Sequence, residues 1–132
     1  MNSSETLHQL QRAVQIEQPD IQKPLFRLFV KNGEYIYARP DDILMVESAD
    51  HLVKVYLQVD GKVKKTVRPN TLKCFLEQLS GAPFARFGRF CAVNMSRISG
   101  GNFHEQSFEF DFKVTIKLSH SLPHHIFSCI GN

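Results

Sequence analysis

Apolar and polar residues alternate strictly near the end of the chain, and this run constrains the fold more than any other feature. The apolar positions of the run are Phe108, Phe110, Phe112, Val114, Ile116 and Leu118. A period of two places apolar side chains on one face of a strand and polar side chains on the other. The run therefore predicts one long strand with one buried and one exposed face.

Turn signals separate shorter strands upstream of this run. Asn32-Gly33 joins predicted strands at 25–30 and 34–38, and Asn-Gly is the strongest short hairpin signal. Other strands are predicted at 43–47, 51–57 and 63–67, with loops at 48–50 and 99–102. Many short strands with hairpin spacing predict an antiparallel, all-β domain.

Helical periodicity is clear in one place within the body of the chain. Leu72, Phe75, Leu76 and Leu79 follow the i, i+3, i+4, i+7 pattern behind an Asn70 or Thr71 cap. A short amphipathic helix is also predicted within residues 1–24, and a brief helix near the C-terminus. With 132 residues, we expect a leader and linker at 1–24 and one domain at 25–132.

Composition excludes several classes of protein. Cys74, Cys91 and Cys129 are odd in number and set in apolar surroundings, as buried thiols are in a reducing compartment. We expect a cytoplasmic protein, because no secretory signal or membrane span is recognisable. No metal or other cofactor is expected, since His120, His124, His125 and Cys129 match no tetrahedral zinc spacing. No nucleotide-binding or nucleophile motif is present, so the sequence does not predict an enzyme.

The stretch 84–94 combines cations with aromatic residues. Arg86 and Arg89 lie among Phe84, Phe87 and Phe90, with no acidic residue nearby. We interpret the aromatic residues as core anchors of a strand pair, and the arginines as groups that project toward an anion such as DNA. The alternative is two solvated arginines on an ordinary strand. The net charge of +3 is compatible with nucleic acid but does not argue strongly for it.

The order of these segments resembles the LytTR-type DNA-binding domain of bacterial transcription regulators. Asp41–Ser48 is similar to the family's D-D-I-x-x-I-E strand, and 84–94 is similar to its F-x-R-x-H-R-S-F-x-V-N signature. Val53–Leu57 and Thr71–Lys73 match the segments between them. The resemblance implies an elongated stack of small antiparallel sheets, in which loops and strand ends meet the DNA.

The resemblance also implies the residues that contact DNA. Base contacts are expected from Arg89, His51 and His120, in three separate segments. Phosphate contacts are expected from basic or polar residues near them, namely Arg86, Lys54, Lys62, Lys64, Lys65, Arg68, Asn94 and Arg97. For Asn94, a structural turn-capping role remains the alternative.

Two departures from the family pattern stand out. No arginine follows Ser119, and Gly88 occupies the place where the family usually has histidine. We therefore expect either narrower specificity or a substitute contact from His120.

The predicted function is sequence-specific binding of double-stranded DNA by a bacterial transcription regulator that reads the major groove. The chain could also form a homodimer on DNA or bind a separate regulatory protein, and both possibilities are left open. No interaction with a membrane is expected. The alternative is a protein-interaction module of the same fold that has lost DNA binding.

Overall fold

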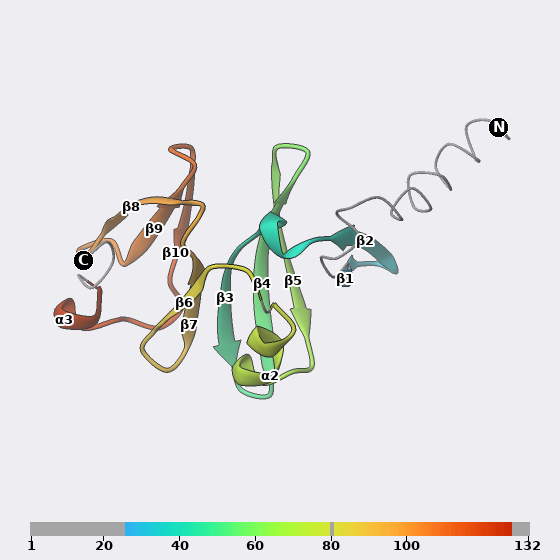
Figure 1. Cartoon of the computed structure of the whole chain (residues 1–132), viewed down its shortest axis with the longest axis horizontal. Helices are drawn as coiled ribbons and strands as arrows, with labels where there is room; N and C mark the ends of the chain where they lie inside the picture. Colours follow the sequence, from blue (N-terminus) through green and yellow to red (C-terminus); the bar gives the residue numbers. More distant parts are fainter. Residues whose placement is uncertain (1–25, 80, 128–132) are drawn as a thin grey trace, which may run out of the picture.

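The computed structural model describes residues 26–79 and 81–127. The predicted leader at 1–24 and Cys129 lie outside the described residues. Three antiparallel sheets of two, five and three strands form the described part of the chain, together with short helices. Figure 1 shows the sheets side by side in an elongated stack, so the predicted fold class is confirmed.

The two-stranded sheet is a hairpin of β1 (Phe26–Lys31) and β2 (Glu34–Ala38). Asn32 and Gly33 connect the strands with φ of 53° and 78°. Positive φ at both central residues is the requirement of a type I′ turn, which Asn-Gly satisfies at low cost. The predicted hairpin is confirmed.

The five-stranded sheet lies in the middle of the stack, in the order β5-β4-β3-β7-β6. Its strands are β3 (Ile43–Ala49), β4 (Leu52–Val59), β5 (Lys62–Arg68), β6 (Phe84–Phe87) and β7 (Cys91–Asn94). A single 3-10 turn, η4 (Pro40–Asp42), leads into β3. The predicted helix is α2 (Leu72–Glu77), capped by Thr71, whose Oγ1 accepts a hydrogen bond from the N–H of Cys74 (3.1 Å).

The third sheet has the order β10-β9-β8 and is followed by α3 (His124–Phe127). Its strands are β8 (Ile98–Asn102), β9 (Ser107–Phe110) and β10 (Val114–Lys117). The prediction of one long strand from Phe108 to Leu118 is wrong, because a turn with positive φ at Asp111 and Phe112 divides it. Phe112 lies on this turn and is 81% exposed.

The predicted loop at 99–102 is also wrong, because these residues belong to β8. Gly101 is needed here for close packing. A Cβ at this position would lie 3.2 Å from Phe127 and 3.3 Å from Phe108. Gly101 therefore lets two aromatic rings approach the strand.

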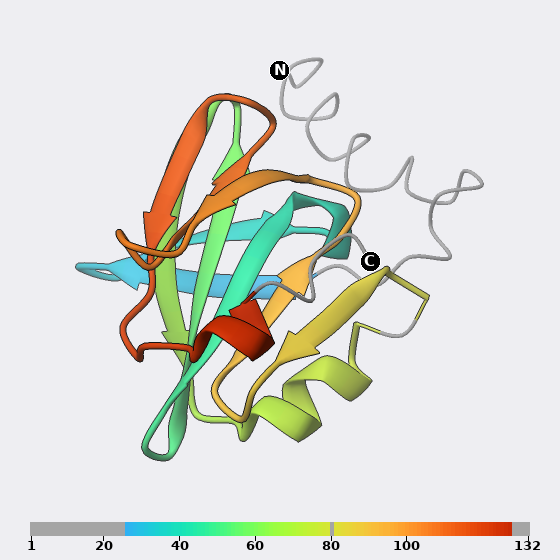
Figure 2. The same cartoon turned by 90° about the vertical axis from the view of Figure 1, so that its left-hand side faces the viewer.

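Two apolar clusters cover opposite faces of the central sheet. Phe26, Leu28 and Phe75 pack on one face with the inward residues of β4. Phe108, Phe110 and Phe127 pack on the other face with Met45, Val93 and Phe87. Figure 2, turned so that the third sheet faces the viewer, shows that sheet in front of the central one. The central strands are held from both sides, which fixes the positions of the turns at their ends.

Candidate nucleic-acid interface

Three segments that are far apart in the sequence meet along one side of the stack, where strands of the central sheet end. They are the β3–β4 turn at 50–51, the β6–β7 turn at 88–90 and the segment 119–120 after β10. We call these residues the loop end, which lies at the lower side of Figure 1. The N–H of Ser48 donates to the carbonyl of Phe90 (2.8 Å), and the Phe90 ring stacks on His120 with centroids 4.6 Å apart. The structure thus brings the segments of His51, Arg89 and His120 together.

Arg86 and Arg89 are exposed beside this turn. A guanidinium nitrogen of Arg86 donates to the carbonyl of Arg89 (2.9 Å), which steadies the turn. Within residues 26–79 and 81–127, neither guanidinium is paired with a carboxylate. Both charges are therefore available to an anion. Phe87 is buried as expected, but Phe90 is 42% exposed and serves the turn through its stack on His120.

Lys54 and Arg68 lie toward the same end but contact other protein groups. Lys54 Nζ donates to Ser119 Oγ and lies 3.7 Å from Oε1 of Glu47, so its charge is partly compensated. Arg68, opposite Val53 in the sheet, has its guanidinium 5.6 Å from the centre of the Phe26 ring. Packing on the ring leaves the guanidinium edge free to donate hydrogen bonds.

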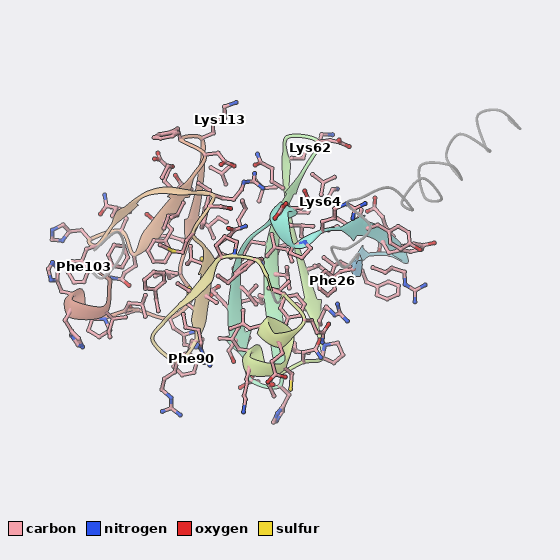
Figure 3. The ribbon with its side chains drawn as sticks, viewed as in Figure 1. Phe26, Lys62, Lys64, Phe90, Phe103 and Lys113 are labelled. Atoms are coloured by element: carbon pink, nitrogen blue, oxygen red, sulfur yellow. The ribbon has the colours of Figure 1, made fainter. Side chains whose placement is uncertain are left out.

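The lysines of β5 extend away from the loop end. Lys62 is opposite Val59, beside the turn at the far end of β4, whereas Leu52 follows the loop-end turn. Seven residue steps along a strand span about 23 Å. Figure 3 shows Lys62 and Phe90 on opposite sides of the molecule. Lys64 and Lys65 lie between these extremes, opposite Leu57 and Tyr56.

The placement of Asn94 does not fit the predicted phosphate contact. Asn94 is 0% exposed, its Nδ2 donates to the carbonyl of Ile43 (2.9 Å), and its Oδ1 accepts from the N–H of Ser96 (3.0 Å). These contacts match the alternative role as a turn cap.

Arg97 does not fit a phosphate contact either, because its guanidinium is used inside the protein. Nε donates to Asp111 Oδ2 (2.8 Å), and another nitrogen donates to the carbonyl of Asp41 (2.8 Å). A further hydrogen bond goes to Gln58 Oε1 (2.6 Å). Arg97 therefore joins the third sheet to the central sheet and to the turn before β3.

Gly88 has a structural reason to differ from the family's usual histidine. Its φ of 73° is a conformation that residues with side chains rarely adopt. A Cβ here would also lie 3.0 Å from Cδ2 of Leu122. The turn is thus packed directly against the segment that follows His120.

Sequence analysis gave Glu47 no role beyond its place in the segment Asp41–Ser48 that resembles the family's strand motif. Glu47 is 1% exposed and accepts hydrogen bonds from the Tyr56 hydroxyl (3.0 Å) and from the N–H of Ser119 (2.7 Å). Burial and the Glu47 charge raise the pKa of Tyr56 to about 12 and also raise the pKa of the Cys91 thiol. The signal in the sequence was an acidic residue directly after four apolar strand residues.

The described residues offer no alternative metal centre. No group of three or more His, Cys, Asp or Glu side chains among them is placed to hold a metal ion. Within the same residues, no helix has both the length and the apolar character that crossing a bilayer requires.

Comparisons with known proteins bear on the fold and the family of the chain. No curated protein matches the chain. Among solved structures, the chain is similar to the LytTr DNA-binding domain from a Bacillus cereus protein described as a methyl-accepting/DNA response regulator. The TM-score is 0.50 at 20% identity, over 71% of this chain and 84% of that chain, so this likeness shows the fold. The family model of the LytTr DNA-binding domain matches residues 33–128. The chain therefore belongs to the LytTR family of DNA-binding domains.

Proposed function

We propose that this chain binds double-stranded DNA in a sequence-specific manner and acts as a bacterial transcription regulator that reads the major groove with its loop end. The observation that carries the proposal is the pair of exposed arginines, Arg86 on β6 and Arg89 on the turn that follows, beside the stack of Phe90 on His120. Among the described residues neither guanidinium is paired with a carboxylate, which suits an anionic partner better than a protein core.

Within this proposal, the residues divide into readers and clamps. The planar guanidinium of Arg89 donates two hydrogen bonds to O6 and N7 of a guanine, while His51 and His120 each contact a base edge. Arg86, Arg68 and Lys54 neutralise phosphates and fix the register without reading bases. Lys64 and Lys65 make at most outer contacts, and we leave Lys62, Asn94 and Arg97 out of the interface.

The proposal includes no enzymatic step. The proposed partner is DNA, which the chain would bind in the cytoplasm of a bacterial cell. DNA would cover only the loop end. The rest of the surface would remain accessible to a second copy of the chain or to a separate regulatory protein.

Selection of bound fragments from randomised duplex DNA tests the proposal. The wild-type chain should enrich a motif that contains a G·C pair read by Arg89. The Arg89→Ala variant should lose discrimination at that pair by about 1–3 kcal/mol, or roughly 5- to 150-fold, and retain the rest of the motif.

Lys113→Ala provides the matched control, since Lys113 lies on the opposite side of the molecule from Phe90 (Figure 3). It should enrich the wild-type motif. An Arg89→Ala variant with an unchanged motif would remove Arg89 from the reading role. A wild-type chain that is retained on neither heparin nor duplex DNA at low salt would instead favour the interaction module, which the missing arginine after Ser119 suggests.

A further inference from the structure

Glu47 is a buried carboxylate at the end of the central strand β3. Its side chain is 1% exposed, and burying a charge is costly unless hydrogen bonds compensate for the lost water. Oε2 accepts the N–H of Ser119 (2.7 Å), and Oε1 accepts the hydroxyls of Tyr56 (3.0 Å) and Ser119 (3.0 Å). Lys54 Nζ, 3.7 Å away, adds a positive charge.

Two of these hydrogen bonds connect distant parts of the chain. Ser119 is 72 residues away from Glu47 and immediately precedes His120. Because both the N–H and the hydroxyl of Ser119 are held, the backbone direction at this residue is fixed. The path that the chain takes into His120 is therefore fixed by Glu47.

The next residue of β3 holds the other turn of the loop end. The N–H of Ser48 donates to the carbonyl of Phe90 (2.8 Å), next to Arg89. The rings of Phe90 and His120 are 16° from parallel, so one face of the imidazole is covered and its edge is left for a ligand. Two consecutive residues of one strand thus set the relative position of two predicted base-reading segments.

We propose that Glu47 is a positioning residue, which holds Ser119 so that His120 stays stacked on Phe90 at a fixed distance from Arg89. This inference rests on the proposed DNA-binding function and adds to it a residue that does not touch DNA. For stability alone, a buried charge is a poor choice, since apolar groups of similar volume often serve as well or better. Its value here lies in geometry, because the carboxylate accepts hydrogen bonds at both oxygens.

Glu47→Gln is the sharpest test in the full chain. A glutamine must direct its NH2 group either at the N–H of Ser119 or at the group formed by Tyr56, Ser119 Oγ and Lys54. The first choice sets two donors against each other, the second requires both hydroxyls to turn and accept, and either one removes the negative charge that faces Lys54. Tyr56→Phe is the matched control, because it removes one donor to the same carboxylate and leaves both bonds to Ser119.

The first measurement needs no DNA. In the wild type and in Tyr56→Phe, ring-current shifts from Phe90 should move the His120 imidazole proton resonances upfield. In Glu47→Gln these resonances should return toward free-histidine positions, while the core resonances of Val46 and Phe110 remain. His120 resonances that stay at their wild-type positions in Glu47→Gln would overturn the inference.

The second measurement is fragment selection with the same variants. His120→Ala identifies the base pairs at which sequence preference depends on His120. At those base pairs, the preference of Glu47→Gln should fall by about fivefold, and the preference at the pair read by Arg89 should stay unchanged. Equal losses at all positions would overturn the positioning role.

If Glu47→Gln does not fold, Ser119→Ala should show a smaller change of the same kind, and wild-type behaviour of Ser119→Ala would count against the inference. If the wild type binds no DNA, the proposed function fails, and the His120 resonances alone decide whether Glu47 positions this turn.

Discussion

Arg89 and Lys62 carry the same charge at different ends of the central sheet, which makes them a direct test of where DNA binds. Both side chains are exposed, and each can be replaced by alanine without opening the core. If the loop end receives the duplex, only the charge of Arg89 lies within reach of a phosphate or a base. The two variants should therefore respond differently to salt.

The size of the difference follows from the geometry. Each neutralised phosphate contributes about 0.9 to the slope of log K against log salt concentration. Arg89 is assigned to a base, but its charge displaces counterions from the groove in the same way, so Arg89→Ala should lower the slope by up to about 0.9, which corresponds to about 3.5-fold between 50 and 200 mM salt. Lys62 lies about 23 Å along the strand from the loop end. Over that distance, with a screening length of about 8 Å at physiological salt, its effect falls to about a twentieth, so the slope should change by less than about 0.1.

Fluorescence anisotropy of a labelled duplex, titrated at several salt concentrations, measures both slopes. The wild-type chain and Lys113→Ala provide the reference values. A slope that falls as much for Lys62→Ala as for Arg89→Ala would refute the assignment of the interface to the loop end. Unchanged slopes in both variants would show that the duplex contacts another surface.

Two further predictions concern the packing around the loop end. In urea titrations, Gly88→Ala should lower the free energy of unfolding by about 1–2 kcal/mol more than Gly33→Ala does. Both glycines have a positive φ, but only at Gly88 would an added Cβ meet Leu122 within 4 Å. Equal losses of unfolding free energy in the two variants would exclude the contact with Leu122. The folded-state pKa of Tyr56, about 12, lies above its usual value of 10. The protonated phenol therefore stabilises the fold up to pH 10, and this stabilisation is lost as pH rises from 10 to 12. The unfolding free energy of Tyr56→Phe should fall less steeply over that interval, and parallel curves would contradict the reasoning.

Local signals predicted much of the fold, because they depend on backbone conformations that few residues adopt. Asn32-Gly33 predicted the hairpin because both residues readily adopt the positive φ that its turn requires. Thr71 predicted the start of the helix because its side chain caps the first turn. The division between β9 and β10 was missed for a physical reason. Phe110 lies opposite Val114 across a turn of residues 111–113, so even-numbered residues face the core on both strands. The alternation of apolar and polar residues is therefore the same in this hairpin as in one long strand, and it cannot tell the two apart.

The candidate site was harder to predict, because its geometry depends on contacts across the chain. The placement of Arg86 and Arg89 among phenylalanines predicted that both arginines would be exposed, but nothing in the sequence separated Lys62 from the loop end. That separation depends on which end of β5 pairs with which end of β4. The hydrogen bonds that Ser119 donates to Glu47 have no local signature, since Glu47 lies on β3 and Ser119 follows β10, 72 residues later.

The contact between Gly88 and Leu122 has a consequence for how related chains can diverge. A side chain at position 88 requires space that Leu122 fills, so the two positions cannot vary independently. Relatives with histidine at the first position should carry a smaller or displaced residue at the second. New base preferences in descendants of this chain would then arise most readily at Arg89, whose side chain is exposed.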